Sequence, residues 1–221
     1  MTAHQFTVVG SELLVEAPII AVRRDQVMMP GDTLAYREVV EHFGAVAVVA
    51  LDNDRVLLIK QYRRAVDQRL WELPAGLLDI AGEDPLEGAR RELAEEAGLS
   101  ANRWGLLCDT VTSPGFCDEA VRIYQAEELS LVSQPVAHDE EADMSVLWVD
   151  LNEAIEMIMK GEIVNSIAIV GLMTAWRLRS TGQALRSETS EFSLRPVKLA
   201  QRRQAMGLTG DMKKKDAQGD H

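Results

Sequence analysis

The chain has few of the features that mark secreted, membrane or disulfide-stabilised proteins. Its 221 residues include only two cysteines, Cys108 and Cys117, whose spacing fits neither a metal site nor a disulfide framework. Two isolated thiols are typical of a reducing compartment. The first residues lack the basic and apolar stretches of a signal peptide, and no apolar run approaches the length that spans a bilayer. These absences predict a soluble, cytoplasmic protein without a membrane partner.

The chain also lacks the basic excess of a nucleic-acid-binding protein. It carries 35 acidic and 23 basic residues, for a net charge of −12, whereas a general nucleic-acid-binding surface shows the opposite balance. We therefore expect no nucleic-acid partner. The acidity fits solubility or a site that concentrates divalent cations, and an anionic substrate would then need local arginines or lysines. The apolar fraction of 47% is ordinary for a globular protein with a core.

The N-terminal part, residues 1–41, reads as short strands separated by glycine and proline. A region of this size cannot bury a core alone. We expect it to pack on the main domain or on a partner subunit.

The main domain is predicted over residues 42–181. It begins with a continuous apolar run, Ala45 to Leu51, which is typical of a buried strand. A helix is predicted over residues 85–97, with Pro85 in its first turn and Gly98 as its C-terminal cap. After residue 181 the chain becomes polar, and residues 182–221 are expected to form a partly disordered extension.

Three carboxylates, those of Glu92, Glu95 and Glu96, lie on neighbouring positions of the predicted helix. Glu92 and Glu96 are four positions apart and share a face. Like charges at this spacing weaken a bare helix by roughly 0.2–0.5 kcal/mol. A hard cation among them would remove the repulsion, and magnesium prefers oxygen ligands and bridges to substrate phosphates. The alternative, a solvated helix face, leaves the rest of the local pattern unexplained.

The segment from Gly76 to Leu99 resembles the Nudix box, Gly-x5-Glu-x7-Arg-Glu-U-x-Glu-Glu-x-Gly-U, where U is a bulky aliphatic residue. The matching positions are Glu83, Arg91, Glu92, Leu93, Glu95, Glu96, Gly98 and Leu99. One departure is visible, because six residues rather than five separate Gly76 from Glu83. The additional residue falls in the loop before the helix, around Ala81-Gly82, and leaves the spacing within the helix intact.

A narrower resemblance is to ADP-ribose pyrophosphatases of the Nudix superfamily, especially the actinobacterial type. Pro114 follows Gly98 by 16 positions, an offset that marks this subgroup. The segment QRLWELPAGLL, residues 68–78, is similar to the family's approach to its box. The resemblance implies an α+β fold, an α/β/α sandwich around a mixed β-sheet. It also implies an N-terminal antiparallel β region used in forming a homodimer.

The activity that the resemblance implies is hydrolysis of the diphosphate of ADP-ribose to AMP and ribose 5-phosphate. Mg2+ is the expected cofactor, with Mn2+ as a substitute. Alternative substrates are another nucleoside diphosphate sugar, a dinucleotide or an oxidised nucleoside triphosphate. A non-catalytic nucleotide-binding module is a further alternative, but all the box carboxylates are present.

The resemblance also assigns metal ligation to positions in the box and its preceding loop. The first choices are Glu92 and Glu96, then Glu95, together with the backbone carbonyl of Ala75. Glu83 and Arg91 are expected to form a buried pair that orients the helix.

A separate catalytic base is expected, because carboxylates occupied by a metal are poor bases. Members of the subgroup use a glutamate on a loop well after the box. Here the acidic loop 139–143 is the one of that kind, with Glu141 as the leading candidate and Glu140 next. The alternative is a solvated acidic loop, as most such runs are.

Substrate contacts are predicted at five positions. Arg63 could bind phosphate through its planar guanidinium. Arg37 could reach a site across a dimer, although an ordinary surface arginine explains it equally well. Glu119 could accept hydrogen bonds from ribose hydroxyls, and Ser113 and Gly115 flank Pro114 in the loop that marks the subgroup.

Overall fold

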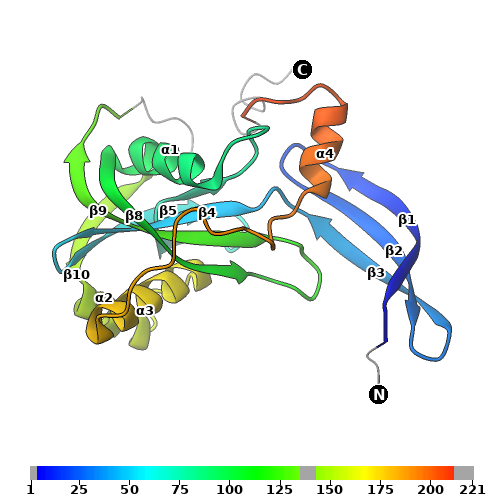
Figure 1. Ribbon diagram of the computed structural model, residues 1–221, viewed down its shortest axis with the longest axis horizontal. Coiled ribbons are helices and arrows are strands. Elements are labelled where there is room, and N and C mark those ends of the chain that lie inside the picture. The colour runs from blue at the N-terminus through cyan, green and yellow to red at the C-terminus, as the bar shows by residue number, and fades with distance from the viewer. Residues whose placement is uncertain (1–3, 135–142, 212–221) are drawn as a thin grey trace.

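The part of the chain that the structure describes folds into two separate β-sheets with four helices (Figure 1). The computed structural model describes residues 4–134 and 143–211. The N-terminal sheet is antiparallel, in the order β1-β2-β3. Its strands are β1 (Thr7–Glu16), β2 (Ala21–Met29) and β3 (Thr33–Glu41).

The second sheet has seven strands and a mixed pattern, because β4 pairs with β9 in parallel and its other pairs are antiparallel. Its order is β10-β5-β4-β9-β8, with β6 paired to β5 and β7 paired to β4. The strands are β4 (Ala45–Asp52), β5 (Arg55–Arg63), β6 (Gln68–Glu72), β7 (Ala75–Leu77), β8 (Leu99–Val111), β9 (Ala120–Leu131) and β10 (Ser145–Asp150).

Helices cover both faces of this mixed sheet. Helix α1 (Pro85–Ala97) packs on one face, and α2 (Leu151–Met159) and α3 (Ser166–Thr181) pack on the other (Figure 1). A fourth helix, α4 (Lys198–Ala205), lies beside the N-terminal sheet. The predicted α+β class and the α/β/α sandwich with a mixed sheet are therefore confirmed.

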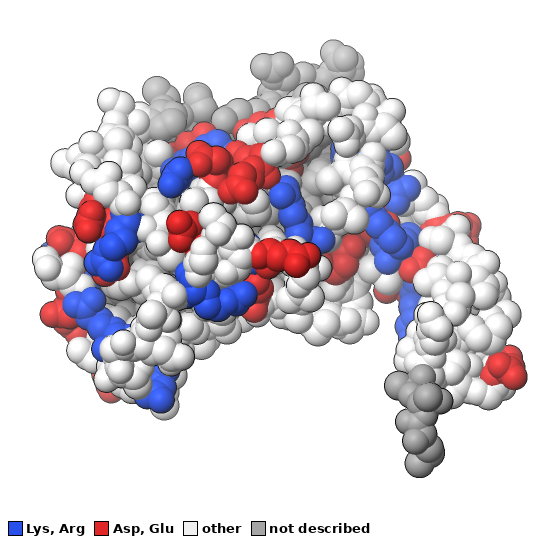
Figure 2. Space-filling view, viewed as in Figure 1, with Lys and Arg blue, Asp and Glu red and all other residues white. Residues whose placement is uncertain are grey.

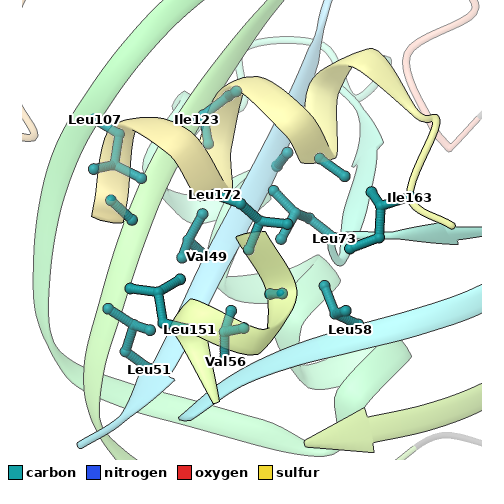
Figure 3. Close-up of a cluster of buried hydrophobic side chains, with 14 of the residues drawn as sticks. Val49, Leu51, Val56, Leu58, Leu73, Leu107, Ile123, Leu151, Ile163 and Leu172 are labelled. Carbon is teal, nitrogen blue, oxygen red and sulfur yellow. The ribbon is translucent and has the colours of Figure 1, made fainter. Parts of the chain in front are cut away.

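The core is arranged around β4, which is buried on both faces. Val46 and Val48 belong to the apolar cluster that includes Leu93 of α1, whereas Val49 belongs to the cluster that includes Leu172 of α3 (Figure 3). Side chains alternate between the two faces of a strand. A strand covered on both sides therefore needs the continuous apolar run that the sequence shows.

Two elements differ from the sequence predictions. Glycine was expected to separate short strands in the N-terminal part, but Gly10 lies within one continuous strand, β1, which has register shifts after Val8 and Leu13. Helix α4 was not predicted, because its segment is polar. Its Leu199 is fully buried against Ala21 and Phe43, a contact with distant parts of the chain that local periodicity does not reveal.

The described part of the chain contains no helix that is both long and apolar enough to cross a membrane. The domain limits at residues 41 and 181 and the cytoplasmic location stay predictions.

Candidate active site

The residues at the two ends of helix α1 determine where it begins and ends. The Asp84 carboxylate caps the N-terminus by accepting a hydrogen bond of 2.8 Å from the Leu86 amide. Pro85 occupies the first turn, where no amide donor is needed. Gly98 ends the helix in the left-handed region at φ 63°, which glycine adopts without strain. These caps fix the position of the carboxylates along the helix axis.

Two carboxylates of α1 are buried against β7. Glu92 is 2% exposed and Glu96 is 4% exposed. One Glu96 oxygen accepts a 2.9 Å hydrogen bond from the Ala75 amide. Glu92 lies so close to Gly76 that a Cβ built there would be 1.9 Å from its carboxyl carbon. Only glycine at position 76 allows this approach, so the first residue of the box shapes the site.

Arg91 contacts three carboxylates of the box, those of Glu83, Glu92 and Glu95. Its Nη1 lies 2.6 Å from Glu92 Oε1 and 3.3 Å from Glu95 Oε2. Its Nε and Nη2 donate to the two Glu83 oxygens at 3.0 and 3.2 Å. Burial disfavours the charge, but hydrogen bonds with Glu83 and the charges of Glu92 and Glu83 raise the Arg91 pKa above its ordinary value. Arg91 therefore stays cationic and balances a dense group of acids.

The donor chemistry of this site fits a hard divalent cation. In residues 4–134 and 143–211, no three acidic, histidine or cysteine side chains already surround one point as a metal cage. However, Glu92, Glu95 and Glu96 supply only oxygen donors, and such cations usually complete their shell with water and substrate phosphates. Figure 2 shows acidic side chains gathered over the α1 region with basic ones beside them. The site is thus suited to chemistry on a phosphate ester or anhydride.

Arg63, predicted to bind phosphate, lies at the end of β5 and contacts a buried acid of β6. Its Nε and Nη2 donate to the two Glu72 oxygens at 3.0 and 2.6 Å. The Glu72 residue is 3% exposed, whereas the Arg63 side chain is 41% exposed. Glu72 orients the guanidinium and leaves part of it accessible to a ligand.

The loop that carries Ser113 and Gly115 is attached to the N-terminal sheet. The Val40 amide of β3 donates to the Phe116 carbonyl at 2.7 Å. The Ser113 carbonyl accepts from two amides of its own loop, those of Phe116 and Cys117. Gly115 is exposed. The structure therefore fixes the loop backbone and presents its tip to solvent.

Glu119 and His42 form a contact that the sequence analysis did not single out. Glu119 accepts a 2.5 Å hydrogen bond from the Thr112 hydroxyl and lies 3.5 Å from His42 Nε2. The His42 Nδ1 accepts from the Gly44 amide at 3.1 Å. Burial lowers the His42 pKa, although the charges of Glu119 and its acidic neighbours oppose this. His42 and Glu119 lie far apart in the sequence, so this contact is detectable only once the fold brings the two side chains together.

A second missed residue is Gln61 on β5. It is 6% exposed, and its Oε1 has no hydrogen-bond partner among the described residues. Gln61 lies on the strand face that Leu57 and Ile59 share with the α1 cluster. The sequence does contain a signal for this residue, because Gln61 is a polar residue at the position that continues the alternating apolar pattern of Leu57 and Ile59. A buried unpaired acceptor is costly, so Gln61 is a candidate for contact with a bound ligand.

The remaining predicted residues are Arg37, Glu140 and Glu141. Arg37 is exposed on β3, opposite Asp25, and donates to the Tyr36 carbonyl. It belongs to the N-terminal sheet rather than to the mixed sheet on which α1 packs. Glu140 and Glu141, the predicted bases, lie outside the described residues.

Comparisons with known proteins show the family and the fold. The family model described as NUDIX domain matches residues 41–166. An ADP-ribose pyrophosphatase of Mycobacterium tuberculosis is 50% identical over 92% of this chain and 99% of its own. A methanol dehydrogenase activator of Bacillus methanolicus is 33% identical over 74% of this chain and 89% of its own. A crystal structure titled ADP compounds hydrolase has a TM-score of 0.72 at 19% identity, covering 83% of this chain and 100% of that one, which shows the same fold.

The close approach at Gly76 predicts the effect of Gly76→Ala. The added methyl group must displace the Glu92 carboxylate, so we expect about 1–3 kcal/mol lower free energy of unfolding. Mn2+ binding, measured by calorimetry, should weaken as well. The control is Gly115→Ala, where the new Cβ meets nothing within 4 Å, and its unfolding free energy should stay within about 0.5 kcal/mol. Unchanged stability and Mn2+ binding in Gly76→Ala would show that Glu92 is not held as described.

Proposed function

The chain belongs to the NUDIX family, and we propose that it hydrolyses the diphosphate of ADP-ribose to AMP and ribose 5-phosphate with Mg2+. The observation that carries the proposal is the 50% identity to an ADP-ribose pyrophosphatase over 92% of this chain. The buried carboxylates of α1 support it, because they provide the acidic oxygen donors that such a hydrolase needs. Mn2+ is the expected substitute for Mg2+.

The proposed ligand residues are Glu92 and Glu96, with Glu95 and the Ala75 carbonyl completing the set. A bound divalent cation supplies neutralisation of phosphate charge and activation of the attacking water. The chain's own part is to orient its carboxylates. Arg91 does this from one side through its contacts with Glu92 and Glu95, and the Ala75 amide does it for Glu96.

The proposed general base is Glu141, with Glu140 as the second choice. Asp143, the first described residue after them, pairs with Arg69 of β6, whose Nε lies 3.0 Å from Asp143 Oδ2. This ion pair attaches the end of the acidic segment to the strand that neighbours Arg63 of β5. That attachment supports a base acting beside the predicted phosphate contact.

A second candidate substrate is another nucleoside diphosphate sugar or a dinucleotide. The relative from Bacillus methanolicus carries a different name at 33% identity, so membership of the family leaves the substrate to be measured. Loops generally vary more between related proteins than the elements that they connect, so relatives with the same helix can act on different substrates.

The first prediction from the proposed function concerns substrate and metal together. With Mg2+, the protein should release AMP from ADP-ribose faster than from other nucleotide sugars or dinucleotides, measured by chromatography of the products. Glu96→Gln should lower kcat by more than about 100-fold, because a metal ligand is lost. Glu87→Gln is the control, since Glu87 lies on the same helix, is exposed and pairs only with Arg90 among the contacts described.

Two outcomes would contradict this prediction. No turnover of any diphosphate substrate would remove the proposed function. Full activity and full Mn2+ binding in Glu96→Gln would remove the metal assignment while leaving the substrate assignment intact.

The second prediction concerns the base. Glu141→Gln should lower kcat by about 100- to 10,000-fold, because general-base catalysis contributes that much. Mn2+ binding and thermal unfolding should match the wild-type protein. Glu140→Gln is the matched control with nearly normal kcat. If the two variants exchange these results, Glu140 is the base.

The proposed assembly is a homodimer formed through the N-terminal sheet. Large apolar side chains are exposed on it, including Val8, Val9 and Val15 of β1 at 51% each and Tyr36 of β3 at 60%. Figure 2 shows that the outer part of this sheet is mostly uncharged on the face in view. Contiguous exposed apolar residues mark interaction sites. Dimerisation would also bring Arg37 of this sheet toward the partner's site.

The third prediction tests this assembly. Light scattering coupled to chromatography should give twice the chain mass of 24.5 kDa for the wild-type protein. Val15→Asp should shift the mass toward the monomer, because a charge would enter the interface. Val164→Asp, at a position 55% exposed outside the sheet, should leave the mass unchanged. A monomeric wild-type protein, or a Val15→Asp dimer of undiminished stability, would contradict the proposal.

A further inference from the structure

The C-terminal segment, residues 183–211, contacts three separate parts of the molecule. We call it the C-terminal strap. It leaves α3, crosses the mixed sheet and reaches the N-terminal sheet at α4 (Figure 1). The sequence predicts only a polar, partly disordered extension here, and the proposed function assigns this segment no role.

The first contact attaches the strap to the mixed sheet. Arg186 and Leu106 of β8 exchange two backbone hydrogen bonds, at 3.0 and 3.1 Å. The buried Arg122 of β9 donates to the Ser190 carbonyl at 2.6 Å and lies 4.4 Å from the Phe192 ring centre. Because Arg122 is 2% exposed, the middle of the strap is fixed to the core rather than lying loosely on it.

The second contact is with the loop that precedes α1, at the place of the additional residue. Glu83 and Ile80 close a turn with a 3.1 Å hydrogen bond. The strap holds this turn at two points. Arg195 Nη1 donates to the Glu83 carbonyl at 3.1 Å, and the Ala81 amide donates to the Thr209 carbonyl at 3.2 Å.

The third contact joins the strap to the N-terminal sheet. Arg202 of α4 lies 2.6 Å from the fully buried Glu41 at the end of β3. Arg203 lies 3.1 Å from Glu16 at the end of β1. The strap therefore connects the sheet proposed to form the dimer with the loop before the metal-binding helix.

Arg195 acts on the site through the residue that it holds. The Glu83 main chain accepts from Arg195, while the Glu83 carboxylate binds Arg91. Arg91 in turn contacts Glu92 and Glu95. A shift of the Glu83 backbone would therefore move the guanidinium that orients two of the proposed metal ligands.

We infer that Arg195 is a positioning residue for the metal site, and that the C-terminal strap holds the loop before α1 in its working geometry. This inference rests on the proposed metal role of the α1 carboxylates. It extends that role to a segment outside the matched residues 41–166. The additional residue in the loop is accommodated because the strap supplies hydrogen-bonding partners for the longer turn.

The main test is Arg195→Ala compared with Arg195→Lys and Arg186→Ala. Mn2+ dissociation constants from electron paramagnetic resonance should rise by about 10- to 100-fold in Arg195→Ala, and the concentration of Mg2+ needed for half-maximal activity should rise in parallel. Arg195→Lys keeps a donor and should recover most of the affinity. Arg186→Ala, at an exposed side chain of the same strap, should bind Mn2+ normally, because Arg186 lies 4.0 Å from Asp109 and away from the loop.

Several results would overturn the inference. One is a folded Arg195→Ala protein with wild-type Mn2+ affinity and Mg2+ dependence. Another is an equal loss in Arg186→Ala, which would indicate general weakening of the strap. A wild-type protein that binds no Mn2+, or whose Glu96→Gln variant binds it equally, would instead show failure of the proposed metal site.

A second measurement keeps the inference testable if Arg195→Ala does not fold. A chain ending at Asp211 retains the Thr209 carbonyl, whereas a chain ending at Leu208 lacks it. Amide hydrogen exchange at Ala81 should be at least about tenfold faster in the shorter chain. The Ala81 amide exchanges when its hydrogen bond to Thr209 opens, and the shorter chain lacks that bond. Mn2+ affinity should fall in the same chain. Equal exchange and equal affinity in the two chains would overturn the positioning role.

Discussion

The ion cluster around Arg91 is the constraint on which the rest of the site depends. Burying Glu92 beside Glu83 and Glu95 without a cation would leave like charges in a region of reduced solvent. Arg91 contacts all three, and removing one partner of a buried ionic group leaves the others uncompensated, typically at about 3–5 kcal/mol. The contacts of Arg91 therefore offset the charges of these acids and hold their side chains in one arrangement.

The cluster is held in place both by elements near it in the sequence and by elements far from it in the sequence. Strand β4 is buried on both faces and gives α1 and β7 a rigid surface. Gly76 of β7 lets the Glu92 carboxylate reach the backbone, and the caps of α1 set where along the helix that carboxylate lies. The C-terminal strap closes the arrangement from outside through Glu83 and Ala81. Residues at its two ends thus determine where α1 begins and ends. Contacts with residues far away in the sequence determine the conformation of the loop before α1.

The sequence predicted the parts of this arrangement that depend on neighbours along the chain. The limits of α1 followed from Pro85 and Gly98, and the burial of β4 followed from its apolar run. Helix α4 was missed because its stabilising contacts, such as Leu199 with Phe43, lie far away in sequence. The Arg63–Glu72 pair and the unpaired Gln61 oxygen were missed for the same reason. The roles of individual site residues stay predictions, since they depend on a ligand.

The central claim is that the α1 carboxylates bind a divalent cation that acts on a nucleoside diphosphate. The most direct measurement is an anomalous difference map from a crystal grown with Mn2+ and a non-hydrolysable ADP-ribose analogue. We expect a Mn2+ peak within coordination distance of Glu92 and Glu96, with the analogue's diphosphate beside it. An ordered Mn2+ and diphosphate bound elsewhere, with Glu92 and Glu96 contacting neither, would contradict it.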